Sequence, residues 1–537
     1  MGVGDEHISD TQPFIGTKSC DEYNTTDARN SENDELALAR SSALIDPAHN
    51  ALRQKDAGWA IAFKVNVGIT VIFALYFGHT GLNGWGTGAF LKGRRLEYQE
   101  EDVSWLLYAL MVVCSVIISW ALSCALLKMM IKFPRFVVEA GYLSWAAVCF
   151  FFAVSSVGEP DDGLYFAIIA PCSAGFLYFF FRGRSRIRFG AANLKVAAVA
   201  VNSMPQTIFA SLCMGGIRLA WLVITIVAAA GSTHGSFFFW LGAALDGTYY
   251  PATACRDVIS SVGPGSTFCE CNGEPVSSDS VCQYSKQSAG LVFFWCLSFV
   301  WGARVINNVI TATVAGSVAS WWFSPNDVAP VRGALYRATH ASFGSLCKAA
   351  AISGVVHLLR EVVNRLVRVV CCLRFLLSWF QNAVDYVLNY VVTFIGIYGL
   401  DFKEASSRVG ELFRTRGITA LANDTGILLG LGALGVFVMS LSSVALYCLL
   451  LLSPVATTTG PEVWPLLAAG HIIYFTSIFT VMDVVYASFK TVFVCFVQDS
   501  EALAANHDRQ YHSELSKAWE EMNVLSLTDG VRGEYQA

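Results

Sequence analysis

Long apolar segments constrain this chain more than any other feature. Stretches of about 20 mostly apolar residues recur along its 537 positions, and a helix of that length spans the roughly 30 Å hydrocarbon core of a bilayer. With 54% hydrophobic and only 14% charged residues, the composition excludes an ordinary soluble protein. The short alternating strands of a membrane β-barrel are not seen in the pattern. The sequence therefore predicts an all-α, polytopic membrane helix bundle.

About ten segments have the length and apolarity of membrane spans, and the lipid bilayer is then the principal surrounding of the protein. They are residues 57–78, 104–127, 134–156, 163–181, 208–231, 288–323, 342–359, 376–399, 425–453 and 464–495.

Basic residues in short loops favour the cytoplasmic side. The basic stretches at 128–135, 182–195 and 331–337 are interpreted as cytoplasmic loops, and the acidic stretch at 158–163 as external. This places both termini in the cytoplasm. The arginine-rich turn at 360–374 fits less well, because it faces outward if both flanking segments span; one of them could instead be an interfacial helix, which would reduce the count to eight.

The two ends of the chain differ from the spans in composition. Residues 1–56 are rich in acidic and small polar side chains and poor in aromatics, so we expect a disordered acidic cytoplasmic tail. No cleavable signal peptide is expected there. Residues 57–499 then form the transmembrane domain, and residues 500–537 form a polar cytoplasmic tail that is either solvated or binds partners.

The predicted external loop at 246–287 contains four cysteines, at Cys255, Cys269, Cys271 and Cys282. An even number of cysteines outside the cytoplasm is most simply explained by two disulfides, whose pairing the sequence does not fix. Zinc binding is the less favoured alternative, because no CxxC pair occurs. No other metal, cofactor or nucleic-acid site is expected.

The apolar segment at 306–323 includes polar side chains that need an explanation. On a helix, Trp301, Asn308, Thr311 and Trp322 lie within a sector of roughly 80°. These residues either bond a neighbouring helix and mark the membrane interfaces, or line a cavity in which aromatic faces hold an organic cation.

A second stripe on the same segment contains small residues at fourfold spacing, Ala312, Gly316 and Ser320. Small side chains allow another helix to approach closely. We therefore expect this stripe to pack against protein.

Residues 299–325, FVWGARVINNVITATVAGSVASWWFSP, resemble the signature helix of the choline transporter-like family. The resemblance continues in FGSL at 343–346, IYGLDFKEAS at 397–406 and TVFVCFVQDSE at 491–501, and the short first outer loop is closer to the fungal and protist branch. It implies a sodium-independent carrier of choline, with ethanolamine as a further candidate substrate and proton exchange as a candidate coupling. The plasma membrane is the expected location, with an organellar membrane as the alternative.

A cationic substrate needs an aromatic cage or a carboxylate near its path. The candidate carboxylates are Glu139, with Tyr142 one turn away, and Asp483; Asp385 also falls in an apolar segment but is harder to assign. This chain departs from the family pattern at Lys403 and Lys490, so a mechanism that relies on an acid near Lys490 is in doubt.

Other classes of function are less consistent with the sequence. It has no histidine box, GxSxG or HExxH motif, which argues against a membrane enzyme. It also has no charged ring or filter sequence, which argues against a channel. A non-transporting scaffold, and a carrier for another organic cation, are the alternatives that remain.

Overall fold

The computed structural model describes residues 54–87, 105–155, 174, 184–232, 255–259, 267–271, 274–276, 289–366, 371–451 and 463–534. Three features predicted above therefore lie wholly or almost wholly outside the described residues: the N-terminal tail up to residue 53, the span at 163–181, and Cys282.

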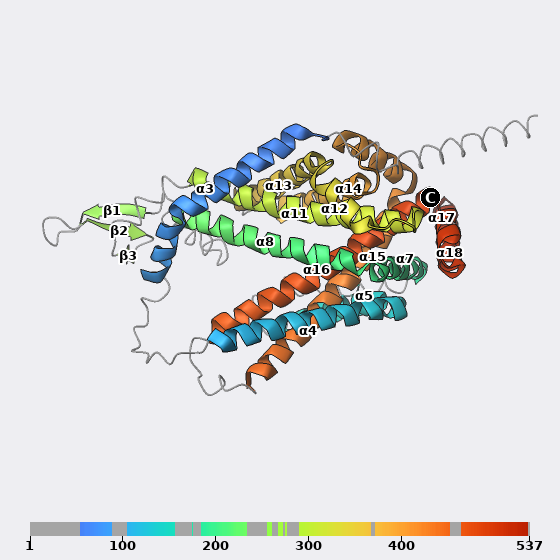
Figure 1. The fold of residues 1–537 in the computed structure, drawn as a ribbon, viewed down its shortest axis with the longest axis horizontal. Helices are drawn as coiled ribbons and strands as arrows, with labels where there is room; N and C mark the ends of the chain where they lie inside the picture. The colour runs from blue at the N-terminus through green and yellow to red at the C-terminus, as the bar shows by residue number, and fades with distance from the viewer. Residues whose placement is uncertain are drawn as a thin grey trace, which may run out of the picture. The chain divides into compact units, whose positions relative to one another are not determined.

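The described chain is mainly helical (Figure 1). Its helices are α3 (Ala57–Thr87), α4 (Trp105–Lys132), α5 (Pro134–Ser155), α7 (Arg184–Ser203), α8 (Pro205–Ser232), α11 (Ala289–Phe323), α12 (Pro330–Thr339), α13 (Phe343–Leu366), α14 (Cys371–Tyr398), α15 (Phe402–Leu451), α16 (Val463–Gln498), α17 (Glu501–Asn506) and α18 (Arg509–Glu534).

The expected spans other than 163–181 all coincide with helices over their described residues. Within those residues, four helices are long and apolar enough to cross a membrane, and the number rises to seven if each bent helix pair counts as one span. The protein is thus a helical membrane protein, and the number of ten spans remains a prediction.

Helix α11 has the most neighbours among the described elements. It contacts α3, α8, α12, α13, α14 and α16. Two glycines permit the closest approaches: a Cβ at Gly302 would lie 2.1 Å from the indole nitrogen of Trp221 on α8, and a Cβ at Gly396 on α14 would lie 2.5 Å from the carbonyl oxygen of Ala312. Small residues here allow helices to pack without a hydrophobic driving force between them.

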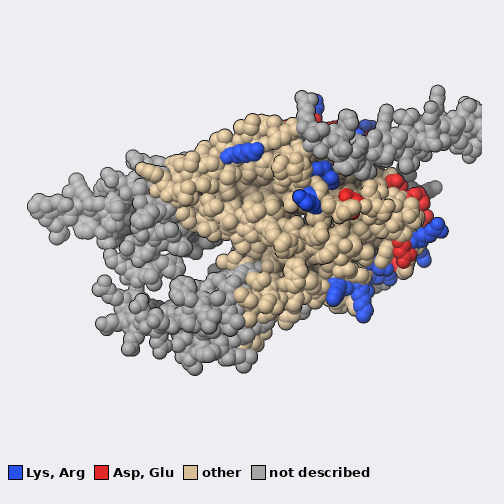
Figure 2. Space-filling view, in the orientation of Figure 1, with Lys and Arg blue, Asp and Glu red and all other residues tan. Residues whose placement is uncertain are grey.

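The sides of the bundle are apolar, as a bilayer requires. On α3, large apolar side chains such as Ile61, Val65, Ile72 and Leu75 are exposed at one-turn spacing. On the face shown in Figure 2, charged side chains gather around the end where α17 and α18 lie, and the remaining described surface is almost free of them. This distribution matches a lipid-facing side and a solvated end.

Three helix pairs are sharply bent at short breaks. The bend is 105° between α4 and α5, 65° between α12 and α13, and 114° between α14 and α15. Pro134 begins α5 after the first break, and Gly399, with a φ of +63°, lies at the third, where a side chain would be strained.

Some segments interpreted as loops or a tail are helical. Much of the basic stretch at 182–195 lies in α7, and residues 331–337 lie in α12. Arg188 and Lys195 of α7 pair with carboxylates of α18, which compensates charges that sequence reasoning had assigned to a loop. The polar segment after residue 500 forms α17, which contacts α11, and α18, which contacts α7.

A small antiparallel sheet forms in the cysteine-containing loop, which the sequence did not predict. Its strands are β1 (Cys255–Ile259), β2 (Thr267–Cys271) and β3 (Glu274–Val276), in the order β1-β2-β3. Cys255 lies opposite Cys271 in the register, and Cys269 lies opposite Val276. The side chains of the four cysteines lie outside the described residues, so the two expected disulfides stay a prediction.

Candidate substrate site

The polar sector predicted on α11 faces α13 over part of its length. The indole N–H of Trp301 donates to the carbonyl oxygen of Cys347 at 3.1 Å, and the side-chain amide of Asn308 donates to that of Leu346, also at 3.1 Å. Both acceptors are backbone atoms of α13. These bonds fix the two helices in register, which is the packing role that the sequence left open for this sector.

Trp301 also belongs to an aromatic cluster that draws on four helices. The ring of Phe63 on α3 packs edge-on against Trp301, with centroids 5.4 Å apart. Phe63 further contacts Trp221 on α8, at 6.4 Å, and Phe343 on α13, at 5.9 Å. We call Phe63, Trp221, Trp301 and Phe343 the aromatic cluster.

A polar cluster begins one turn along the same face of α11. Arg304 approaches Asp385 on α14 at 3.7 Å, and the same carboxylate accepts hydrogen bonds from His357, at 2.7 Å, and from Ser353, at 2.7 Å. His357 and Ser353 are both on α13. Arg304 and His357 are also in direct contact through Nη2 and Nε2.

Two further side chains extend this polar cluster. Gln381, one turn before Asp385 on α14, lies 2.6 Å from Nδ1 of His357 through its amide nitrogen. Arg360 donates to the side-chain oxygen of Gln381 at 2.6 Å. We call Arg304, Ser353, His357, Arg360, Gln381 and Asp385 the polar cluster.

The polar cluster combines one carboxylate with three basic side chains. Asp385 has an 18% exposed side chain and is held by Arg304 and by His357, which is charged only when protonated. Breaking such a pair inside a membrane leaves an uncompensated charge, so ionisable groups there mark functional sites by default. The arrangement is suited to a protonation step or to an ion pair that opens and closes.

Trp322 lies far from the aromatic cluster. It follows Trp301 by 21 positions, which is roughly 31 Å along a straight helix. Its ring is fully buried and its N–H donates to the carbonyl oxygen of Asp499 at 3.1 Å. Trp301 and Trp322 therefore cannot form one cage in this conformation, although they lie on one sector of α11.

The small stripe on α11 meets α12 and α14. A Cβ at Gly316 would lie 2.9 Å from the carbonyl oxygen of Gly396 and 2.9 Å from Cβ of Ala334. Ala312 packs under Gly396, as described above, and Thr311 is buried beside it. Ser320 is half-buried at the end of the stripe.

The predicted carboxylates are not brought to this site. Glu139 is exposed on α5, Asp483 lies on α16, and neither joins the aromatic or the polar cluster. The side chain of Tyr142 lies outside the described residues. Among the described residues, no group of His, Cys, Asp and Glu side chains is arranged to hold a metal ion.

Sequence reasoning missed most of the polar cluster, although its signal was present. Arg304 lies on the Trp301–Asn308 face, within a predicted span. Ser353, His357 and Arg360 are spaced at i, i+4 and i+7, and Gln381 and Asp385 at i and i+4. Such spacing puts polar side chains on one face of each apolar helix.

A second missed feature joins two of the sequence motifs. Asp56, just before α3, accepts hydrogen bonds from Ser345 at 2.8 Å and from the backbone N–H of Phe402 at 3.1 Å, and lies 3.4 Å from the Nζ of Lys348. Ser345 belongs to FGSL and Phe402 to IYGLDFKEAS. Lys55 adds a bond from its Nζ to the carbonyl oxygen of Gly399 at 2.6 Å.

The environment of Asp56 favours its charged form. Partial burial opposes ionisation, but the hydrogen bonds from Ser345 and Phe402 and the charge of Lys348 outweigh it and lower the pKa of Asp56 below its ordinary value of 3.8. We call Lys55 and Asp56, with the groups they bind, the Asp56 clamp.

A helical membrane bundle whose central helix carries polar and aromatic clusters beside broken helices is an arrangement found in many membrane transporters. The sequence pattern described as plasma-membrane choline transporter matches residues 167–501. This chain belongs to the choline transporter-like family.

Relatives of the chain come from fungi and a social amoeba. The protein PNS1 of Kluyveromyces lactis is 25% identical over 87% of this chain and 80% of its own length. PNS1 of Saccharomyces cerevisiae is 27% identical over 61% of this chain and 59% of its own length. A CTL-like protein of Dictyostelium discoideum is 24% identical over 65% of this chain and 56% of its own length.

Proposed function

We propose that this protein is a sodium-independent carrier of choline, with ethanolamine as a second substrate. The observation that carries this proposal is the aromatic cluster, in which Trp301 of α11 and rings from α8 and α13 converge on Phe63 of α3. The family match supports a transporter. The aromatic cluster supports a quaternary ammonium as the transported substrate.

A quaternary ammonium offers no hydrogen-bond donor, so a protein holds it by cation–π attraction to aromatic faces. The attraction is strongest for Trp and is worth about 2 kcal/mol in a desolvated site. Phe63 and Trp221 are each less than 10% exposed, which provides the low-water surroundings that such a site needs. In this structure the rings pack on one another, and they separate to admit the cation.

The polar cluster supplies the counter-charge and a route to proton exchange. In our proposal, the protonated His357 and the arriving cation compete for Asp385: when the cation is attracted to the carboxylate, the imidazolium of His357 gives one proton to water and becomes neutral. One positive charge then replaces another, so the local charge stays constant beside Arg304 and Arg360. Ser353 remains hydrogen-bonded to Asp385, and Gln381 to His357.

Alternating access requires parts of the bundle to move, and broken helices are where the backbone can bend. The break between α14 and α15 lies next to the Asp56 clamp, and the break between α12 and α13 precedes FGSL. Both breaks border helices that carry the polar cluster. We propose that these breaks are the hinges and that the plasma membrane is the site of transport.

The direct test is uptake of radiolabelled choline into cells that lack their own choline transport, with the amount of this protein at the surface verified. Saturable uptake that unlabelled choline and ethanolamine compete away, and that is unchanged when sodium is replaced, would support the carrier. Flux that does not saturate would indicate a channel. No flux in either direction at several pH values would overturn choline transport and favour a scaffold.

Two variants of Trp301 separate cation binding from helix packing. Trp301→Ala removes both the ring and the bond to Cys347, and we expect KM for choline to rise about 5- to 30-fold. Trp301→Phe keeps a ring but loses the bond, so its KM should rise less. Trp379→Ala, which removes an exposed tryptophan of α14, is the matched control. Equal KM values in all four proteins would contradict the aromatic site.

A further inference from the structure

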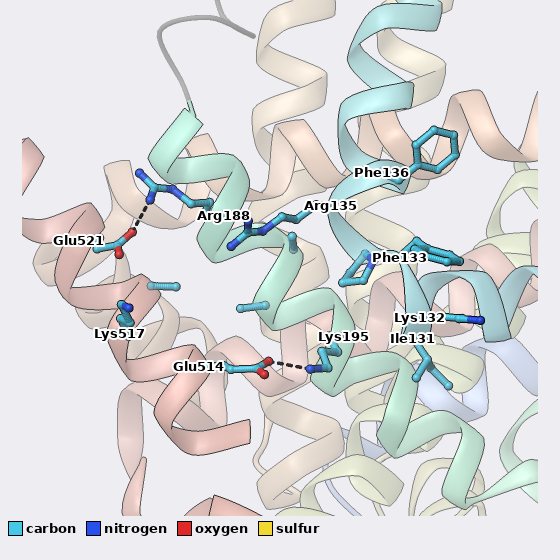
Figure 3. A pocket seen from close by; sticks show the side chains of 14 residues that line it. Ile131, Lys132, Phe133, Arg135, Phe136, Arg188, Lys195, Glu514, Lys517 and Glu521 are labelled. Atoms are coloured by element: carbon cyan, nitrogen blue, oxygen red, sulfur yellow. Dashed lines mark hydrogen bonds and ion pairs between the residues drawn. The ribbon is translucent and has the colours of Figure 1, made fainter. Parts of the chain in front are cut away.

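A cavity of about 720 Å³ lies between the α4–α5 bend, α7 and α18, away from the aromatic and polar clusters (Figure 3). Its size is within the range of small-molecule sites. It is separate from the proposed choline route, because none of the residues that line it belongs to either cluster.

Two ion pairs and three alanines shape this cavity. Arg188 of α7 pairs with Glu521 of α18 at 2.9 Å, and Lys195 pairs with Glu514 at 2.7 Å, so each helix is bridged at positions seven residues apart. Between the bridges, Ala191 and Ala192 of α7 and Ala518 of α18 are too short to fill the space. The bridges hold α7 and α18 together, and the alanines leave the hollow that Figure 3 shows.

The cavity has an excess of positive charge. Five basic side chains line it against two carboxylates, an excess of three, and both carboxylates are already paired with Arg188 and Lys195. Lys132, Arg135 and Lys517 have no ion pair within the described part of the chain, and all three are exposed. Glu139 follows Arg135 by one turn without pairing with it. The pKa of Glu514 is lowered: burial opposes this, but bonds from Lys195 and Gln510 and the charge of Arg135 outweigh it, so this carboxylate stays ionised.

The mouth of the cavity has the character of a membrane surface. Phe133 and Phe136 flank the α4–α5 bend and are 52% and 61% exposed, next to Lys132 and Arg135. Exposed aromatics beside cations are typical of the boundary between lipid tails and headgroups. α4 is strongly apolar and the basic stretch at 128–135 follows its apolar part, so we place the bend where this helix leaves the bilayer.

We propose that this cavity binds the phosphorylated headgroup of an anionic phospholipid from the adjacent leaflet. Arg135 and Lys517 contact the phosphate oxygens, while Phe133 and Phe136, with Lys132 beside them, contact the lipid at the mouth. Arginine and lysine are the usual partners of phosphate, and basic pockets between membrane helices bind phosphoinositide headgroups. A choline cation is repelled by the same charges, so the cavity is not a second substrate site.

The charge count favours a headgroup with a phosphomonoester. A phosphoinositide monophosphate has one diester charge and about 1.5 to 2 further charges on its monoester, which matches the cavity's excess of three positive charges. Lipid bound there would bridge the α4–α5 bend to α18, so the C-terminal helices would be held by the membrane as well as by the ion pairs.

The test uses the full-length protein in detergent and native mass spectrometry with three probes: phosphatidylinositol 4-phosphate, phosphatidylcholine and soluble inositol 1,4-bisphosphate. We expect one tightly held phosphatidylinositol 4-phosphate per protein and far weaker retention of the other two. The double variant Arg135→Gln/Lys517→Gln should lose roughly 30-fold in affinity for this lipid. Its elution volume and Tm should be unchanged, because both side chains are exposed and unpaired among the described residues.

Arg332→Gln is the matched control, since Arg332 is an exposed basic residue of α12 that does not line the cavity. Full lipid binding by the double variant, or an equal loss with Arg332→Gln, would overturn the site. Equally tight binding of soluble inositol 1,4-bisphosphate would show that the anion need not come from a lipid and would overturn the lipid assignment.

Discussion

Asp56 shows how one carboxylate can connect parts of a membrane protein that are distant in sequence. It receives hydrogen bonds from α13 and from the start of α15, and it has an unusual backbone φ of 51°. Next to it, a Cβ on Gly344 would lie 2.3 Å from the Asp56 carbonyl oxygen, so the glycine in FGSL is needed for this approach. The motif thus has a structural explanation as a docking point for the start of α3.

Asp56→Asn should weaken this clamp. The variant keeps one oxygen acceptor but loses the attraction to Lys348, and hydrogen bonds to a charged group contribute about 1.5–3 kcal/mol. We expect a lower Tm in detergent. Glu404→Gln, which removes an exposed carboxylate paired within α15, is the control and should leave Tm almost unchanged. Identical Tm values for the two variants would argue against the clamp.

The clamp should also respond to acid. Because the folded-state pKa of Asp56 is below 3.8, its stabilisation is fully present above about pH 3.8 and is lost as the pH falls through the folded-state pKa. Between pH 5 and pH 3, the Tm of the wild type should therefore fall more than that of Asp56→Asn. Parallel falls in the two proteins would show that another group controls acid stability.

Asp385 is the residue whose charge the proposed transport cycle needs. Asp385→Asn keeps an acceptor for Ser353 but removes the negative charge that faces Arg304 and His357. We expect choline uptake to fall at least about tenfold at equal surface expression, and its dependence on external pH to flatten.

Glu139→Gln tests the same charge change at an exposed position outside the polar cluster and should transport normally. If instead Glu139→Gln abolishes uptake and Asp385→Asn does not, one of the two carboxylates named first from sequence is the functional one.

At the scale of helices, close packing around α11 depends on glycine. Gly396→Ala would place a Cβ 2.5 Å from a backbone oxygen and 2.8 Å from Cα of Ala312, and backbone atoms cannot rotate away. We expect a loss of about 1–3 kcal/mol in the free energy of unfolding, measured as a fall in Tm.

Gly410→Ala on α15 meets no atom within 4 Å and is the matched control. It should be neutral or slightly stabilising, because alanine is the better helix former. A stable Gly396→Ala protein would mean that α14 can move away from α11 at little cost.

Helices could be predicted from sequence where apolar length decides them. α3, α8, α11 and α16 correspond to predicted spans because each is long and continuously apolar. α7 was missed because its first half is basic, and two of its charges, Arg188 and Lys195, are compensated by Glu521 and Glu514, more than 300 positions away. Sequence periodicity describes the faces of a single helix. It therefore does not predict a helix whose charges are compensated by residues far away in the sequence.

The same limit applies to the candidate site. The α11 face with Trp301 and Asn308 was predicted, since it depends only on spacing within one helix. Its partners Phe63, Trp221 and Phe343 were not, because they come from three other helices. Asp385 was seen singly in an apolar segment, but only tertiary packing shows that it bonds His357.

For the whole molecule, the clearest asymmetry is one of charge. Charged side chains gather at the end where α17 and α18 lie, while the cysteine-containing strands lie in the segment between α8 and α11 (Figures 1 and 2). By the positive-inside rule, we expect the charged end to be cytoplasmic.

An epitope placed after Ala537 tests this orientation. The antibody should bind only after the plasma membrane has been permeabilised, whereas an epitope inserted between β1 and β2 should be detected on intact cells. Staining of the C-terminal epitope on intact cells would reverse the predicted topology.

The Asp56 clamp has a consequence for how the protein is made. The partners of Asp56 in α13 and α15 follow it by 289 and 346 residues. At about 5–20 residues per second, the ribosome needs roughly 15 to 70 seconds after α3 emerges before both partners exist. During that interval α3 is in the membrane without the contacts of the Asp56 clamp. Membrane-insertion factors that bind early spans therefore have a defined period in which to act on α3.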